Sequence, residues 1–251
     1  MNLSLTLIIP AKKEEEAVIH TLEQIKKRVK SPHKIIVVND SFDGDNTGEI
    51  VKQYIKKNKN VSVVINRKNP HPTFASALVL GFNRVKNGVV IPVMADLCDR
   101  VEDIDIMYKK MHEGWDIVCG SRYISGGGKK GGPLVQSVCS FLVCSSLHFL
   151  TGIPTTDVSN AFKMYRKDIL KKPIIDIKNG VEVSMAITLQ AYFSNAKITE
   201  IPTRWIGRSL GKSKFKIIER TPPYYKICVW AIKNTIRRHL HLKILKYNIN
   251  Y

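Results

Sequence analysis

Residues 5–16 read LTLIIPAKKEEE, an apolar run that ends in a proline and leads into three consecutive glutamates. An apolar run of this kind predicts a buried strand, and the acids then stand where the next helix should begin. The same succession recurs at residues 34–43 and 89–99, where aspartates follow the apolar run. Because the carboxyl ends of parallel strands share one edge of a sheet, we expect the three acidic islands to converge on a single crevice.

The order of elements around these islands predicts a parallel α/β sheet. Apolar runs alternate with segments of helical period. Strands are expected at residues 5–9, 35–38, 61–65, 89–94 and 117–119, and helices at residues 15–29, 47–57, 74–85 and 101–112. This β-α-β-α order is typical of a doubly wound sheet.

The pattern changes after Gly120. The elements expected there are a glycine and lysine loop at 126–132, an apolar helix at 134–150, an extended segment at 159–165, a helix at 181–193 and a strand at 197–201. No serine, glycine or proline tract is long enough to form a linker. One domain with an elaborated second half is therefore the simplest division.

The composition is strongly basic. The chain has 251 residues and a net charge of +19, so its surface outside the islands should attract phosphate groups, nucleic acid or an anionic leaflet. Acids in the main crevice would repel a nucleic acid. The five cysteines form neither a C-x-x-C pair nor a Cys/His ligand spacing, which favours reduced thiols in a cytosolic setting over a zinc site.

No targeting segment is expected. The N-terminus lacks a basic stretch followed by a long apolar one, so a secretory signal is not predicted. Residues 134–150 are apolar but interrupted by serines, a glutamine and a histidine, which falls short of the ~20 predominantly apolar residues that span a bilayer. We expect a buried or interfacial helix there, and a cytoplasmic protein without a transmembrane helix.

Each island has two interpretations. The glutamates Glu14 to Glu16 could stabilise the start of a helix, and residues 39–45 could be a turn followed by a helix cap. Asp96 and Asp99 could likewise cap the helix that begins near Val101. A carboxylate at the end of a central strand can instead hold Mg²⁺ or Mn²⁺ together with phosphate oxygens. Three islands in this order favour one shared ligand site.

Six segments, taken in order, resemble the family 2 inverting glycosyltransferases and, within them, the dolichol-phosphate mannose synthase group. They are residues 8–15 (IIPAKKEE), 36–41 (IVVNDS), 94–97 (MADL), 120–123 (GSRY), 157–166 (DVSNAFKMYR) and 208–214 (RSLGKSK). The resemblance implies a Rossmann-like GT-A fold over residues 1–215. Residues 1–120 would form its nucleotide-sugar half and residues 121–215 its acceptor half.

The resemblance also implies roles for the acids. Pro10, Glu14 and Asp40 would line the pocket for the nucleoside, because carboxylates accept hydrogen bonds from sugar hydroxyls and base N–H groups. Asp96 would hold Mg²⁺ or Mn²⁺ on the diphosphate and thereby take part in catalysis. Four residues would bind phosphate through planar or compact donors. These are Arg122, Arg208, Ser213 and Lys214, of which Arg208 is also expected to be catalytic.

The chain departs from the family pattern at four places. Met94 replaces the first acid of the usual Asp-x-Asp pair, Asn39 replaces a more usual Asp, and Lys13 stands where Asn is common. Residues 134–137, LVQS, lack the arginine pair that often precedes the apolar helix. The metal inference therefore rests on Asp96, and the acceptor is less defined than the donor.

The function implied is transfer of one sugar, with inversion, from a UDP- or GDP-sugar to a dolichyl or undecaprenyl phosphate. A phosphate monoester is already largely ionised at neutral pH and needs positioning rather than a base. An alternative acceptor is a sugar hydroxyl in surface polysaccharide or lipopolysaccharide biosynthesis, which needs a carboxylate to take its proton. Asp157 is the candidate base, although it could instead be a cap or a contact of Arg166.

Two other interpretations concern the activity itself. Arg204 and Trp205 lack the glutamine of the Gln-x-x-Arg-Trp motif of processive synthases, so a single transfer is favoured. The Met94 departure leaves room for a basic membrane- or nucleic-acid-binding protein with a decayed active site.

Residues 216–251 mix aromatics with lysines and arginines, which suits peripheral attachment to the cytoplasmic face of a membrane. A helix packed on the core with a solvated basic face is the alternative.

Overall fold

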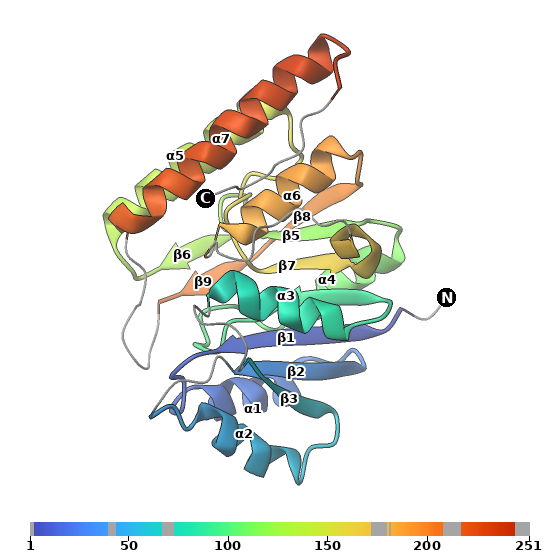
Figure 1. Ribbon diagram of the computed structural model, residues 1–251, viewed down its shortest axis with the longest axis vertical. Coiled ribbons are helices and arrows are strands. Elements are labelled where there is room, and N and C mark those ends of the chain that lie inside the picture. Colours follow the sequence, from blue (N-terminus) through green and yellow to red (C-terminus); the bar gives the residue numbers. More distant parts are fainter. Residues whose placement is uncertain are drawn as a thin grey trace.

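The chain folds around a seven-stranded sheet with the order β3-β2-β1-β4-β7-β5-β8 (Figure 1). This computed structural model describes residues 3–39, 44–66, 73–171, 180, 182–207 and 217–243, with only the backbone for 171 and 217–220. The strands are β1 (Leu5–Ala11), β2 (His33–Asn39), β3 (Val61–Ile65), β4 (Val89–Pro92), β5 (Ile117–Ser121), β7 (Lys163–Arg166) and β8 (Ile198–Pro202). All of them run parallel except β7, which is antiparallel to β4 and β5. The carboxyl ends of the parallel strands therefore share one edge.

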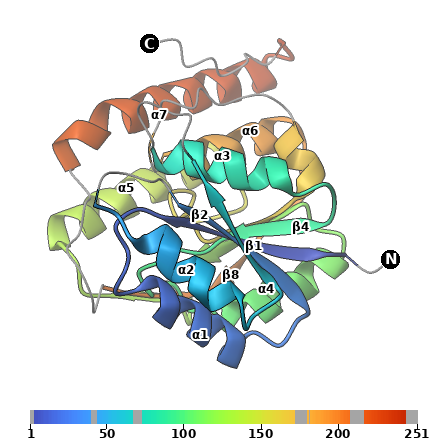
Figure 2. The same cartoon turned by 60° about the horizontal axis from the view of Figure 1, so that its bottom comes forward.

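Helices cover both faces of this sheet (Figure 2). One face carries α1 (Val18–Arg28), α2 (Thr47–Ile55) and α4 (Asp103–His112), and the other carries α3 (Phe74–Arg84) and α6 (Val183–Phe193). The expected strand and helix order is confirmed. The first helix begins three residues later than predicted, at Val18, and its first turn contains no acid.

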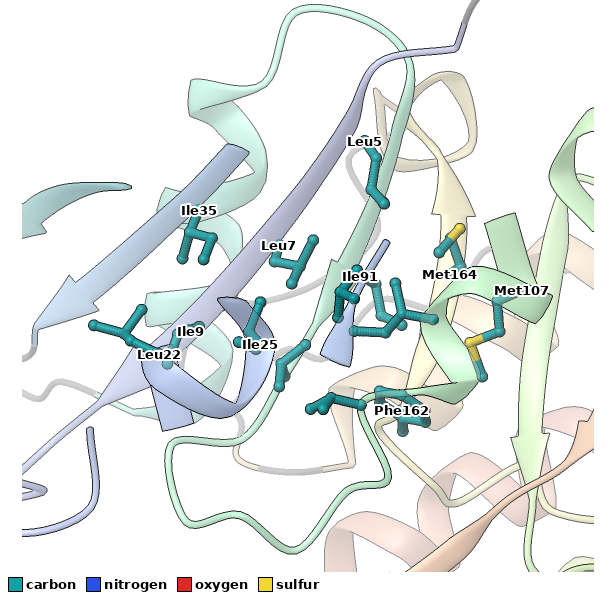
Figure 3. Close-up of a cluster of buried hydrophobic side chains, with 14 of the residues drawn as sticks. Leu5, Leu7, Ile9, Leu22, Ile25, Ile35, Ile91, Met107, Phe162 and Met164 are labelled. Carbon is teal, nitrogen blue, oxygen red and sulfur yellow. The ribbon is translucent and has the colours of Figure 1, made fainter. Parts of the chain in front are cut away.

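The larger core lies between the sheet and the α1, α2 and α4 layer. Figure 3 shows its apolar side chains from β1, β2 and β4 meeting those of α1, α4 and β7. Leu7 and Ile9 project to this side from alternate positions of β1, while Ile8 between them belongs to the opposite core. This alternation is the two-residue period of a strand buried on both faces.

On the opposite face α3 approaches the sheet closely because it carries Gly81. A Cβ added at Gly81 would lie 2.4 Å from Cγ2 of Ile8 and 3.2 Å from Cγ2 of Val38. The absence of a side chain thus lets the helix backbone rest directly on β1 and β2. Together with the large core, this contact holds the ends of the first strands in a rigid frame.

The second half of the chain adds a smaller sheet and two long helices. Strand β6 (Gly128–Lys130) pairs in parallel with β9 (Arg204–Ile206), and α5 (Leu134–Thr151) packs beside α7 (Ile217–His239) (Figure 1). A short 3-10 helix, η1 (Lys167–Lys171), follows β7. Cys144 and Leu147 of α5 pack with Ile227 and Trp230 of α7 in a third apolar cluster.

The surface of α5 corrects part of the sequence interpretation. Only 17% of the helix is buried in the protein, so the expectation of a buried helix is wrong and the interfacial alternative remains. Its exposed apolar side chains are Leu134, Val135, Val138, Phe141, Leu142, Phe149 and Leu150. Within the described ranges α5 is also the one helix long and apolar enough to cross a membrane. The sequence interpretation excluded a membrane span on length and composition, but by these two criteria alone α5 could form one.

Candidate functional site

The first two strands end level with each other, and the residues after β1 lie beside the start of α2. In the β1–β2 register, Pro10 lies opposite Val38 and Ala11 opposite Asn39. The backbone N–H of Glu14, just beyond β1, donates to Oγ1 of Thr47 at the start of α2 (3.0 Å). Asp40 lies outside the described residues. The structure thus places Pro10 and Glu14 at the carboxyl edge, as the sequence predicts.

Asp45 holds the two strand-end loops to each other. Its carboxylate accepts from the Lys13 N–H at 3.0 Å, from Nδ2 of Asn39 at 3.3 Å and from the Thr47 N–H at 2.9 Å. Burial by itself would raise the pKa of Asp45, but these hydrogen bonds outweigh it and lower the pKa. Lys13, whose N–H makes one of these bonds, has a left-handed backbone with a φ of 52°. The residue at the N-cap of α2 is Asn46, whose side chain makes no cap hydrogen bond, so the helix cap predicted within residues 39–45 is not formed; Asp45 instead binds the Thr47 N–H at the start of the helix.

The third island forms a compact acidic loop after β4. Oδ1 of Asp96 accepts from the Cys98 N–H (3.2 Å), and Oδ2 of Asp99 accepts from the Met94 N–H (3.3 Å). Helix α4 begins only at Asp103, and the N-cap residue before it, Glu102, makes no side-chain cap. The alternative that Asp96 and Asp99 cap this helix is therefore not what the structure shows.

The charge of Asp96 acts on the neighbouring carboxyl of Asp99. Burial and the neighbouring charge of Asp96 raise the pKa of Asp99 to about 7, against the opposing effects of the Met94 N–H and the Arg122 charge. Two carboxylates near one another are a donor set that Mg²⁺ and Mn²⁺ favour, with phosphate oxygens completing the shell. In the described part of the chain no three His, Cys, Asp or Glu side chains group together. The two neighbouring acids fit a cation whose remaining positions a diphosphate would fill.

The sequence assigned the metal to Asp96 alone, but the carboxylate of Asp99 lies close to that of Asp96. The Asp99 carboxylate bonds to the backbone of Met94, the position at which the family pattern would have its first acid. The sequence signal was its place in the third island, but only the turn of the loop brings it back to Met94. The left-handed backbone of Leu97, with a φ of 60°, lies within that turn.

Arg122 and Asp157 form a buried ion pair at the end of β5. Nε and Nη2 of Arg122 donate to the two carboxylate oxygens of Asp157 at 2.6 and 2.7 Å, and the Arg122 N–H donates to Oδ2 at 3.0 Å. Asp157 is fully buried. Burial alone would lower the pKa of Arg122, but the charge of Asp157 raises it. Arg166 pairs with Asp116 at 3.5 Å, so the alternative contact between Asp157 and Arg166 is not formed.

The loop that carries Asp157 is fixed at both ends by charged side chains. Glu200 of β8 accepts from Oγ1 of Thr155 (3.0 Å) and from the Thr156 N–H (2.8 Å). On the other side Nζ of Lys163, which is fully buried, donates to the carbonyls of Val158 (2.8 Å) and Asn160. Sequence patterns did not single out Glu200 or Lys163, because Glu200 binds a loop about 45 residues away in the chain and Lys163 binds only backbone carbonyls.

Strand β9 joins the acidic loop after β4 to the second half of the chain, which carries Arg122. The backbone of Trp205 forms an isolated bridge with Asp99, and the Ile206 N–H donates to the carbonyl of Cys98 (3.0 Å). Oγ1 of Thr203 donates to Asp103 at 2.6 Å. Asp96, Asp99 and Arg122 are thus gathered at one edge by contacts between the two halves of the chain. The predicted phosphate ligands Arg208, Ser213 and Lys214 lie outside the described residues.

A sequence model described as glycosyl transferase family 2 matches residues 6–173. The chain belongs to glycosyltransferase family 2. This glycosyltransferase is 24% identical over 238 residues to the polyprenol monophosphomannose synthase of Mycolicibacterium smegmatis, covering 92% of the chain and 88% of that relative. It is 25% identical over 237 residues to the dolichol-phosphate mannosyltransferase of Pyrococcus furiosus, covering 91% of the chain and 64% of the relative.

Solved structures show the same fold. A glucosyl-3-phosphoglycerate synthase from Mycobacterium tuberculosis, in complex with Mn²⁺, UDP and phosphoglyceric acid, superposes with a TM-score of 0.65 at 13% identity. The match covers 96% of this glycosyltransferase and 80% of that chain. S. aureus TarS matches with a TM-score of 0.61 at 16% identity, over 94% and 72% of the two chains. The expected GT-A fold is therefore confirmed. All five cysteines of this glycosyltransferase are free thiols in the structure.

Proposed function

We propose that this glycosyltransferase moves one sugar, with inversion, from a nucleotide-diphospho-sugar to a polyprenyl phosphate at the cytoplasmic face of a membrane. Two relatives that match over about nine-tenths of the chain are named for mannosyl transfer to polyprenol or dolichol phosphate. The site adds a chemical reason for a phosphate acceptor over a hydroxyl acceptor.

The observation that carries this choice is the engagement of Asp157. Both of its oxygens bind Arg122 and the residue is fully buried, so the carboxylate is poorly placed to take a proton from an incoming hydroxyl. A phosphate monoester has a second pKa near ~6 and needs no such base. We assign Asp157 to positioning Arg122, whose charge would then stabilise the acceptor phosphate.

The donor would occupy the acidic side of the same edge. Pro10, Glu14 and Asp40 would contact the nucleoside, and Asp96 with Asp99 would hold Mg²⁺ or Mn²⁺ on the diphosphate. Such an ion, when bound, stabilises the negative charge that develops on the leaving nucleoside diphosphate. The fit of two neighbouring carboxylates to a hard cation supports this assignment. Arg208, Ser213 and Lys214 would add cationic and hydroxyl donors to Arg122 on the acceptor phosphate.

The α5–α7 layer supports attachment to the membrane. The exposed side chains Phe141, Leu142 and Phe149 give α5 an apolar surface, and α7 adds exposed Ile232 and Ile236. Helix α7 also presents cations beside this surface, which are Lys226, Lys233 and Arg237. Apolar side chains flanked by cations suit the interface of an anionic leaflet, at roughly 1 kcal/mol for each cation near the surface.

The connections of α5 favour lying in the interface over crossing the bilayer. The helix begins just after β6, which pairs with β9, and it ends just before Thr155 and Thr156, which are bonded to Glu200 of β8. Midway, the hydroxyls of Ser140, Tyr123 and Ser159 are linked by hydrogen bonds of 2.9 Å. Both ends and the middle are therefore tied to one folded body.

The proposal is tested by binding and by product analysis. GDP, UDP and their sugars are screened by thermal shift with and without Mn²⁺, because a ligand that binds only the folded state raises the apparent stability. The stabilising donor, carrying a labelled sugar, is then incubated with the protein and polyprenyl phosphate in vesicles. Label in the solvent-extractable lipid is the expected result.

Two other outcomes would overturn the proposal. Label in a water-soluble or surface glycan would assign the enzyme to hydroxyl acceptors. Absence of transfer with every stabilising donor would favour a binding protein with a decayed site. The Asp96→Ala variant, assayed in parallel, ties any measured turnover to the acidic loop.

A further inference from the structure

We propose that Lys129, seated on the ring of Trp205, is a second cation for the phosphate of the acceptor. This inference deepens the proposed function and rests on it. Lys129 occupies the middle of β6, and its register partner in β9 is Trp205. Its Nζ atom lies over the indole ring, 4.8 Å from the centroid. That distance is within the range at which an ammonium is attracted to an aromatic face.

The position of Lys129 is built by the glycine-rich loop around it. Gly131 and Gly132 have φ values of 84° and 77°, which favour residues without a side chain. A Cβ at Gly132 would approach the Trp205 ring to 3.3 Å, so the chain after Lys129 lies closely over that ring. An ammonium confined in this way loses less conformational entropy when it binds a ligand than a freely rotating one.

The surroundings of Lys129 are short of negative charge. Burial and the nearby charge of Arg122 lower the pKa of Lys129, whereas Asp157 acts in the opposite direction. Asp157, however, is already engaged by Arg122 in a buried pair. Among the described residues no carboxylate forms an ion pair with Lys129. Two cations that share one carboxylate favour binding of a further anion.

The place of this cation relative to the acidic loop indicates which anion it would bind. The ring of Trp205 carries Lys129, and the backbone of Trp205 bridges to Asp99. A phosphate held between Lys129 and Arg122 would therefore lie beside the diphosphate on Asp96 and Asp99. An acceptor oxygen placed there could attack the sugar carbon as the bond to the diphosphate breaks. Lys129 and Arg122 would hold the charge of the acceptor phosphate, and the acidic loop with its cation would hold the charge of the leaving diphosphate.

Lys130 provides a matched control. It is the next residue of β6, it carries the same charge, and it is exposed to solvent while Lys129 is half-buried. Residues 134–137, which form the first turn of α5, contain no cation. Lys129→Met keeps most of the apolar stem over Trp205 and removes only the charge, and Lys129→Arg restores a cation. Lys130→Met removes an equal charge from the same loop.

The decisive experiment measures binding of farnesyl phosphate, a short water-soluble probe, by calorimetry to the wild type and these three variants. Farnesol, which lacks the phosphate, separates binding of the chain from binding of the head group. Lys129→Met is expected to weaken farnesyl phosphate binding by about 10- to 100-fold, the range for losing a charge-assisted hydrogen bond. Lys129→Arg should recover most of the affinity, and Lys130→Met should change it less than threefold, roughly the effect of a surface charge.

Steady-state kinetics give a second readout. Lys129→Met should raise KM for the acceptor with KM for the nucleotide sugar unchanged, and its thermal stability should match that of Lys130→Met. Equal affinity of Lys129→Met and wild type for the probe would overturn the inference, as would a rise in the donor KM alone. A wild type that binds no prenyl phosphate would instead reject the proposed acceptor class itself.

Discussion

The carboxylate of Asp157 accepts two parallel hydrogen bonds from the guanidinium of Arg122, with Nε–Oδ2 and Nη2–Oδ1 distances of 2.6 and 2.7 Å. The pair joins the end of β5 to the loop before β7, and Ser159 extends it through a 3.3 Å contact to Nη2. An arginine oriented in this way is held at the carboxyl edge of the sheet before any substrate arrives. The pair is a structural contact, and under the proposed function it would also support the side chain that binds the acceptor phosphate.

Removing the charge of Asp157 should destabilise the protein strongly. Asp157→Asn leaves the Arg122 charge buried without its counter-ion, and the free energy of unfolding is expected to fall by about 3–5 kcal/mol. Urea unfolding measures the change. The control is Asp116→Asn, because Asp116 pairs with Arg166 at 3.5 Å in a partly exposed contact, and such pairs contribute at most about 1 kcal/mol. Equal losses in the two variants would contradict a special role for the buried pair.

Asp45 should make stability depend on pH in the acid range. A carboxyl whose pKa is lower in the folded state adds stability above its unfolded pKa of about 3.9, and this is lost as the pH falls through the lower folded pKa. Asp45→Asn is therefore expected to lower the free energy of unfolding at pH 7 by at most about 1 kcal/mol, since the group is partly exposed. Below about pH 4 the difference from wild type should shrink toward zero. A constant difference across this range would show that ionisation of Asp45 is unimportant.

Metal-dependent nucleotide binding should depend on both acids of the loop after β4. Asp96→Asn and Asp99→Asn are each expected to lower the affinity for Mn²⁺ by about 10- to 100-fold. The part of the nucleotide thermal shift that depends on Mn²⁺ should shrink in both variants. Calorimetric titration of Mn²⁺ in the presence of the nucleotide measures this affinity. Glu113→Gln is a suitable control, because Glu113 follows the last turn of α4 and pairs with Lys110 on the surface. Unchanged Mn²⁺ affinity in Asp99→Asn would leave Asp96 as the sole acid of the metal site.

The apolar surface of α5 should decide membrane binding. Phe149 is 86% exposed to solvent. Phe149→Glu is expected to weaken binding to anionic vesicles roughly tenfold or more, because less apolar area is buried in the membrane. Co-sedimentation at several salt concentrations separates this term from attraction to the cations of α7. Ile106→Glu on α4 is the matched control, since Ile106 is an exposed apolar residue on a helix that packs on the sheet. If both variants bind vesicles equally, α5 is not the membrane contact.

The local pattern was sufficient for most elements because each repeats a simple period. Residues 35–38 are an uninterrupted apolar run and residues 5–9 are apolar except for Thr6, which suits strands buried on both faces. Helices α2, α3 and α4 occur where helical period predicts them. The pattern was less reliable at boundaries. Glu15 was expected inside a helix that in fact begins at Val18, because Glu14 and the residues after it are held by contacts to the start of α2.

For the site, the sequence by itself determined which acids stand at strand ends, since that depends only on the order of strands and on the shared edge of a parallel sheet. Tertiary structure decided the partners. Asp157 binds Arg122 rather than Arg166, and Asp99 turns back to Met94, because these contacts arise from the antiparallel β7 and from a left-handed residue in the acidic loop. It also decided that α5 is exposed rather than buried, since hydropathy records how apolar a helix is and not whether neighbouring elements cover it.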